Sequence, residues 1–138
     1  MIIIQIHYPI HTEIINIMRY KLTTQEILEI KPIKLTQKDV SKYFKLLYKE
    51  LDVINYITFK KLRTNRGYYI VTATPTSIYI ELDPREVLLP TLIHELSHSA
   101  FPNMNEIEIL TLEASLINRF TILQYKQLLK KATSKIKL

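Results

Sequence analysis

The chain has 138 residues, of which 47% are apolar, and it contains four histidines, one glycine and no cysteine. This length suits one domain with a modest hydrophobic core. The absence of cysteine excludes a disulfide-stabilised scaffold and every thiolate metal site. A metal ion would therefore need histidine, carboxylate, carbonyl or water ligands.

The formal charge of +6 could attract nucleic acid or another anionic surface. However, the lysines are scattered between Lys31 and Lys49, and they gather only at Lys60 and Lys61 and in residues 130–138. This distribution favours a solvated surface with a frayed basic tail. Nucleic-acid binding through that tail is the alternative.

The chain shows no internal repeat, no low-complexity linker and no boundary rich in proline or glycine, which predicts a single domain over residues 1–138. No window reaches the roughly 18 apolar residues that a membrane-spanning helix requires. The N-terminus has neither a basic segment nor a small-residue cleavage site. We therefore expect a cytoplasmic protein with no membrane partner.

The first elements in chain order have weak signals. Residues 2–7 predict a buried strand. His7 and His11 are four residues apart, but Pro9 lies between them and breaks the helix that would place them on one face. We expect ordinary structural roles for both histidines.

The signal is stronger from Thr36, which with Asp39 resembles an N-terminal capping pair. Apolar residues then recur at spacings of three or four, which predicts an amphipathic helix of about five turns. These residues are Val40, Phe44, Leu47, Leu51 and Ile54.

Residues 57–62 and 68–74 are rich in β-branched and aromatic side chains and predict two strands. The segment 63–67 between them holds the only glycine, which predicts a hairpin loop in which Gly67 has a positive φ. A third strand is expected over residues 77–82, where apolar and polar side chains alternate.

Two helices are expected after the strands. Pro90 is tolerated in the first turn of a helix that runs to about Ala100. Asn103 or Asn105 can cap a last long helix that continues to about Lys130. The predicted fold class is therefore α+β, with an N-terminal helix, a small, mainly antiparallel sheet, a middle helix and a C-terminal helix.

The middle helix carries the pattern HExxH, formed by His94, Glu95 and His98. Residues four apart project from the same side of a helix, so the two imidazoles can bind one metal ion. Leucine, isoleucine and alanine occupy the opposite side of this helix. Glu95 lies at the edge of the polar side, where its carboxylate could take a proton from metal-bound water without itself binding the metal.

Residues 91–100 resemble the active-site helix of zincin metallopeptidases, particularly the small single-domain kind seen in phage, viral and SprT-like proteins. The resemblance covers about residues 78–120. It implies that His94 and His98 are zinc ligands and that Glu95 is the catalytic base. It also implies that the strand before the helix has an edge that can pair with an extended substrate.

Catalytic zinc needs a third protein ligand and one open position. The metzincin pattern is excluded because Phe101 and Met104 stand where its glycine and third histidine would be. No histidine follows His98, so the downstream histidine of SprT-like enzymes is also absent. A downstream glutamate, as in gluzincins, is the remaining family option.

Glu106 and Glu113 are seven residues apart and share the inward face of the last helix, whereas Glu108 points away. If the two helices fold back on each other, Glu106 faces His98, and we favour Glu106 as the third ligand. Glu113 is the alternative, because many gluzincins have a longer gap and residues 112–114 resemble the second helix of ImmA-like peptidases. The other glutamate could then orient a histidine ligand.

These features predict a zinc-dependent metallopeptidase that acts on a peptide or protein substrate. For Tyr68, Tyr69 and Tyr79 of the sheet we favour packing or surface exposure. The alternative is that a phenol stabilises an oxyanion, and Tyr79 is the first candidate for that role. Two other functions stay open: a zinc-binding module without catalysis, and a basic protein that associates with nucleic acid.

Overall fold

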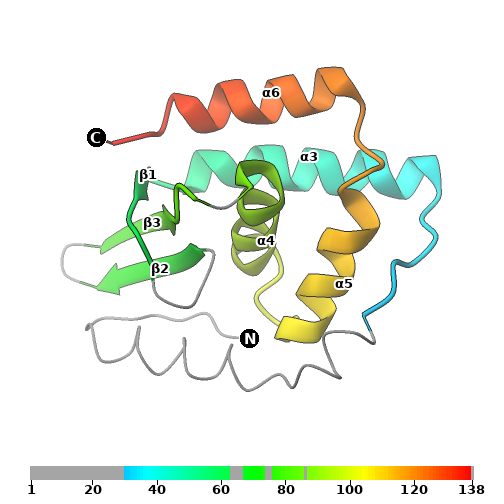
Figure 1. Cartoon of the computed structure of the whole chain (residues 1–138), viewed down its shortest axis with the longest axis horizontal. Coiled ribbons are helices and arrows are strands. Elements are labelled where there is room, and N and C mark those ends of the chain that lie inside the picture. Colours follow the sequence, from blue (N-terminus) through cyan, green and yellow to red (C-terminus); the bar gives the residue numbers. More distant parts are fainter. Residues whose placement is uncertain (1–29, 63–66, 74–75, 86, 138) are drawn as a thin grey trace.

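The computed structural model describes residues 30–62, 67–73, 76–85 and 87–137. The predicted strand at 2–7, with His7 and His11, lies outside these residues. The described elements, in chain order, are α3 (Gln37–Val53), β1 (Tyr56–Phe59), β2 (Gly67–Ala73), β3 (Thr76–Leu82), α4 (Leu88–Ala100), α5 (Glu106–Leu116) and α6 (Ile122–Thr133) (Figure 1). The coarse α+β prediction is thus confirmed.

Helix α3 forms as its sequence predicts. The Thr36 hydroxyl accepts a hydrogen bond from the Asp39 amide at 3.1 Å, and the Asp39 carboxylate accepts one from the Thr36 amide at 3.4 Å. This capping box satisfies two amides that the helix itself leaves without partners. All five predicted apolar positions of this helix are buried.

The sheet is mixed, with strand order β1-β3-β2. Strand β3 pairs with β2 in antiparallel fashion and with β1 in parallel fashion. The predicted hairpin between 57–62 and 68–74 is therefore wrong, because β3 lies between these strands. The physical reason is the length of the connections: only two residues join β2 to β3, so these two strands form the antiparallel hairpin, and β1 pairs with the other side of β3. It follows that β3 offers no edge to a substrate, contrary to the expectation from the family resemblance.

Gly67 also differs from its predicted role, since its φ lies outside the left-handed region. A Cβ at this position would lie 2.9 Å from the carbonyl oxygen of Glu81 and 3.1 Å from Cγ2 of Thr91. The glycine therefore permits a close approach of β2 to β3 and α4.

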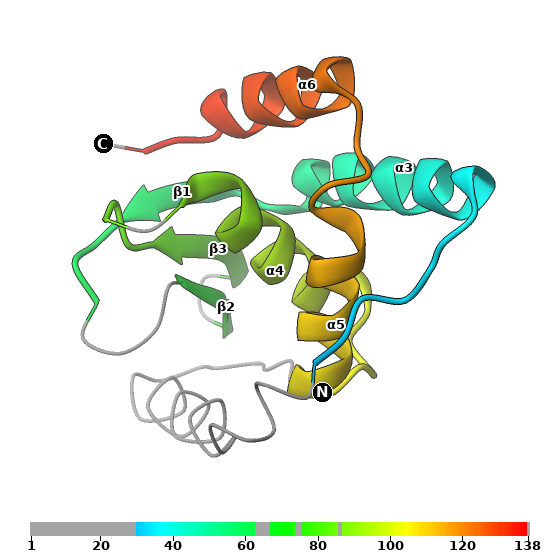
Figure 2. The same ribbon diagram turned by 45° about the vertical axis from the view of Figure 1, so that its right-hand side comes forward.

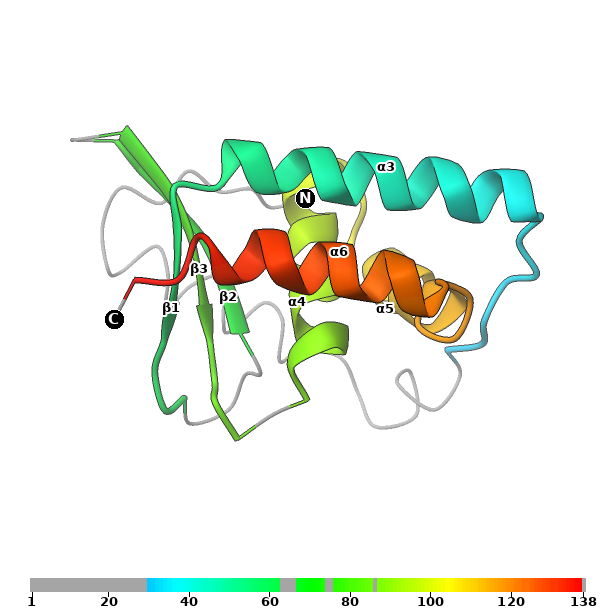
Figure 3. The same ribbon diagram turned by 90° about the horizontal axis from the view of Figure 1, so that it is seen from above.

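The predicted last helix is divided into α5 and α6. Thr121 begins α6 with a second capping box, in which its hydroxyl accepts from the Gln124 amide at 3.1 Å. The break turns the buried Phe120 ring onto Phe44, with 5.6 Å between ring centroids. Helix α6 can then lie beside α3, as Figure 3 shows from above, while a continuous helix would point away from it.

The basic segment after α6 is ordered, contrary to the predicted fraying. The amide of Ile57 donates to the Lys135 carbonyl, and the amide of Lys137 donates to the Ile57 carbonyl, both at 2.8 Å. Residues 135–137 therefore pair with β1 as a short parallel bridge at Ile136.

Helix α4 occupies the centre of the fold, between the sheet and α5, and α3 and α6 pass over one side of it (Figures 1 and 2). Leu92, Ile93 and Leu96 of α4 pack in one core with residues of α3 and the sheet. This position buries eight consecutive residues of α4, Thr91 to His98. Within the described residues, no helix is both long enough and apolar enough to cross a membrane.

Candidate metal centre

The turn between α4 and α5 brings the predicted ligands together. Helix α4 ends where the Phe101 amide donates to the Ser97 carbonyl at 2.8 Å. Asn105 begins α5 with a capping box, in which its side chain accepts from the Glu108 amide at 2.9 Å. The chain reverses within a few residues, so the first residue of α5, Glu106, comes to lie against the last turns of α4.

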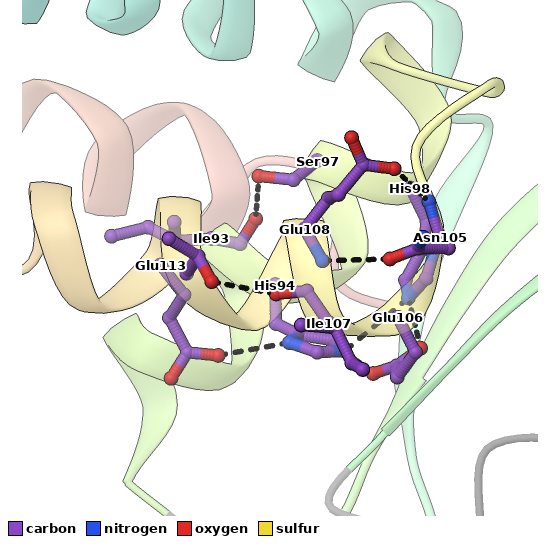
Figure 4. Close-up of polar contacts among 10 residues, drawn as sticks. Ile93, His94, Ser97, His98, Asn105, Glu106, Ile107, Glu108 and Glu113 are labelled. Atoms are coloured by element: carbon purple, nitrogen blue, oxygen red, sulfur yellow. Dashed lines mark hydrogen bonds and ion pairs between the residues drawn. The ribbon is translucent and has the colours of Figure 1, made fainter. Parts of the chain in front are cut away.

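His94, His98 and Glu106 form a compact cluster of three possible metal ligands, with donor atoms within 4.8 Å of one another. The Nε2 atoms of the two histidines are 3.3 Å apart. Oε1 of Glu106 lies 2.6 Å from Nε2 of His94, and Oε2 lies 2.9 Å from Nε2 of His98. Figure 4 shows the Glu106 carboxylate facing both rings.

Glu113 lies on the opposite side of the His94 ring (Figure 4). Its Oε1 atom is 2.9 Å from Nδ1 of His94. The two glutamates therefore have different positions: Glu106 faces the Nε2 atoms of both rings, and Glu113 contacts the second nitrogen of one ring. Glu108 is outside the cluster, since its carboxylate accepts from the Asn105 amide at 3.0 Å.

Burial and charge act in opposite directions on this cluster. Burial disfavours the charged imidazolium of His94, but hydrogen bonds to Glu106 and Glu113 outweigh that effect and raise the pKa of His94 to about 9. Burial likewise opposes the charged Glu106 carboxylate, yet its hydrogen bonds to His94 and His98 hold its pKa well below the usual range. These opposite pKa shifts describe a largely buried ion pair between His94 and Glu106.

The donor positions fit a tetrahedral metal ion. Zinc–ligand distances of about 2.0–2.1 Å imply about 3.3 Å between donor atoms at the tetrahedral angle. The two Nε2 atoms already have this 3.3 Å separation. The Glu106 oxygens are closer to the nitrogens, at hydrogen-bond distances of 2.6 and 2.9 Å, so the carboxylate would have to shift for both histidines and Glu106 to bind one ion. Two nitrogens and one oxygen are also the donor types of catalytic zinc sites with three protein ligands.

Glu95 is 2% exposed and lies on the same helix as both histidines. Its charge is close enough to contribute to the raised pKa of His94. It does not belong to the group of three possible ligands. The role of Glu95 as a base stays a prediction.

Tyr79 is not brought to the cluster. Side chains alternate along a strand, and Ile80 and Leu82 of β3 pack in the core with α4. Tyr79 therefore lies on the other face of the sheet, where its ring stacks on Tyr56 with 4.7 Å between centroids. Among the described residues, the structure gives it no place beside the histidines.

A contact that sequence reasoning missed supports the end of α4. The Ser99 hydroxyl donates to the Glu50 carboxylate of α3, and it also hydrogen-bonds Tyr69 of β2. Ser99 follows His98 directly, so these contacts join the end of the histidine-bearing helix to two other elements. No local pattern marks Glu50 for this role, because the pairing depends on how α3 crosses α4.

Comparison with known protein families, curated proteins and solved structures finds no match to this chain. The functional assignment therefore depends on the residues and geometry of the site itself.

Proposed function

We propose that this protein is a zinc-dependent metallopeptidase. The observation that supports the proposal is the convergence of His94, His98 and Glu106 on one position, with an HExxH glutamate on the same helix. Three protein ligands leave one tetrahedral position for water, which is the arrangement of catalytic zinc. The histidines lie on the buried helix α4, and Glu106 lies at the capped start of α5.

Each residue then has a defined role. His94, His98 and Glu106 would hold the ion, which supplies a Lewis acid that lowers the pKa of water in the open position towards 7. Glu95 would accept a proton from the attacking water and transfer it to the leaving amine. Glu113 would accept a hydrogen bond from Nδ1 of His94 and so orient the Nε2 lone pair towards the metal.

The test uses the purified full chain, measured for zinc stoichiometry and for cleavage of a fluorogenic peptide library. We expect one zinc per chain, and we expect Glu95→Gln to retain zinc and lose cleavage. His98→Ala should lose both. Glu108→Gln is the matched control, because it removes a carboxylate of the same helix that points away from the cluster. Full cleavage by Glu95→Gln would refute the proposed base.

The second candidate is a zinc-binding module without catalysis. Burial favours it, since His94, Glu95 and His98 are only 5%, 2% and 4% exposed. A substrate carbonyl must reach the open position, whereas a structural ion needs no such access. Stoichiometric zinc with no cleavage of any library peptide, together with a zinc-dependent rise in melting temperature, would select this candidate.

A further inference from the structure

A row of lysines follows the outer side of α3. Lys38, Lys42, Lys45 and Lys49 are spaced by four, three and four residues, so they lie above one another on one face of the helix. The buried residues of α3 occupy the opposite face, and all four lysines are exposed. The scattering of lysines that the sequence suggests thus becomes an ordered row once the helix forms.

Helix α6 extends this basic surface. Lys126 and Lys130 are one turn apart and exposed, on the side opposite the buried Leu128 and Ala132. The ammonium of Lys131, which points towards α3, lies 2.9 Å from Asp52 and so joins the two helices. Helices α3 and α6 lie side by side (Figure 3), and both contribute their buried residues to one core. By helical position, the two sets of lysines therefore point outward on the same side of the molecule.

The lysine face comprises Lys38, Lys42, Lys45, Lys49, Lys126 and Lys130. Asp52 lies beside it by helical position and its side chain is 65% exposed, but its carboxylate is paired with Lys131. The three acidic residues of α3 are engaged elsewhere: Asp39 in the capping box, Glu50 with Ser99 and Asp52 with Lys131. Helix α6 has no acidic residue. In the part of the chain that the structure describes, none of the six lysines forms an ion pair.

Exposed apolar side chains lie among these lysines. Leu46 and Val53 of α3 are 38% and 47% exposed, and Leu123 of α6 is 64% exposed. By helical position all three point to the outer side with the lysines. Lysines and exposed apolar side chains thus lie on the same side of the two helices. A partner that presented only phosphate would contact the lysines and leave the three apolar side chains in water.

We propose that the lysine face, with Leu46, Val53 and Leu123, binds the surface of an anionic lipid bilayer. The ammonium groups would contact lipid phosphates and carboxylates, while the three apolar side chains enter the boundary with the acyl chains. Duplex nucleic acid fits less well, because this face carries no arginine for base edges, no aromatic ring for stacking, and apolar groups without a partner. This proposal departs from the expectation of no membrane partner, which considered only spanning and leader segments and not binding at the membrane surface. It does not depend on the metal centre.

The experiment measures sedimentation of the full chain with vesicles of phosphatidylcholine alone or mixed with phosphatidylserine. We expect binding only to the mixed vesicles. Added salt should weaken this binding, because dissolved ions screen the attraction between the lysines and the anionic lipids. The double variant Lys42→Gln/Lys49→Gln should bind the mixed vesicles about 25-fold more weakly, because each lysine near an anionic surface contributes about a factor of five to the partition coefficient. Lys60→Gln with Lys61→Gln removes the same charge outside the face and should leave partitioning nearly unchanged.

A third variant separates lipid from other polyanions. Leu123→Gln keeps the charge and should weaken vesicle partitioning about tenfold, because the leucine leaves water only in a bilayer. Absence of binding to the mixed vesicles would overturn the proposal, as would equal weakening by the two lysine pairs. Tight binding of duplex DNA, with no effect of Leu123→Gln on vesicles, would assign the face to nucleic acid instead.

Discussion

The two inward glutamates of α5 make a quantitative prediction about zinc affinity. Glu106 lies 2.6 and 2.9 Å from the Nε2 atoms of His94 and His98, so on the proposed function Glu106→Ala removes one of the three possible metal ligands. Glu113 contacts only Nδ1 of His94, at 2.9 Å, so Glu113→Ala removes a group that orients a donor. Loss of such an orienting partner lowers metal affinity by about 10- to 100-fold, and loss of the donor should lower it further.

The assay is competition for zinc with a chromophoric chelator, applied to both alanine variants and to Glu108→Ala as control. Glu113→Gln adds a second comparison, since its amide oxygen can still accept from Nδ1–H and should recover most of the affinity. We expect the order of affinity wild type, Glu113→Gln, Glu113→Ala, Glu106→Ala, from tightest to weakest. If Glu113→Ala lost zinc while Glu106→Ala bound it almost normally, the assignment of the two glutamates would be reversed.

Three further predictions concern stability. Gly67→Ala should destabilise the fold by about 1–3 kcal/mol in urea unfolding, since the new Cβ would meet a backbone oxygen at 2.9 Å; an unchanged midpoint would contradict this close approach. Thr121→Ala should cost about 1 kcal/mol by the same assay through loss of the α6 capping box, and no loss would count against the observed helix break. Hydrogen bonds from Arg85 hold the pKa of Asp83 below its usual range, so this carboxylate stabilises the fold above its unfolded pKa of about 3.9 and the contribution is lost as pH falls. The melting temperature of Asp83→Asn should therefore lie below that of wild type at neutral pH, with the difference shrinking in acid; a difference that does not change with pH would refute this reasoning.

Local signals in the sequence predicted the elements that depend on local physics. The capping pair Thr36 and Asp39 marked the start of α3, and the HExxH spacing placed His94 and His98 on one side of α4. The α6 capping box, from Thr121 to Gln124, has the same kind of local pattern. It was not predicted, because the long apolar pattern around it favoured one continuous helix.

Strand order could not be predicted in the same way. Adjacent strands in sequence often pair, as β2 and β3 do, but β1 pairs with β3 and not with β2. Isoleucines of all three strands are buried, so the hydrophobic pattern does not distinguish the central strand from the edge strands. A glycine at position 67 could be required either by a positive φ or by a close approach of neighbouring atoms. Only the packing of β2 against β3 and α4 distinguishes these two explanations. The difference between Glu106 and Glu113 needed the turn after α4, whose geometry depends on packing.

The pairing of residues 135–137 with β1 has a consequence for how the chain folds. Ile57 exchanges two backbone hydrogen bonds with a segment that is synthesised long after it. During translation, the outer side of β1 therefore stays without these partners until α6 and the residues that follow it have left the ribosome. Closing so distant a pair is slow compared with forming local helices. We expect α3 and α4 to gain structure first and the β1 edge to close late, which makes this edge the place where an unfinished chain would associate with another strand.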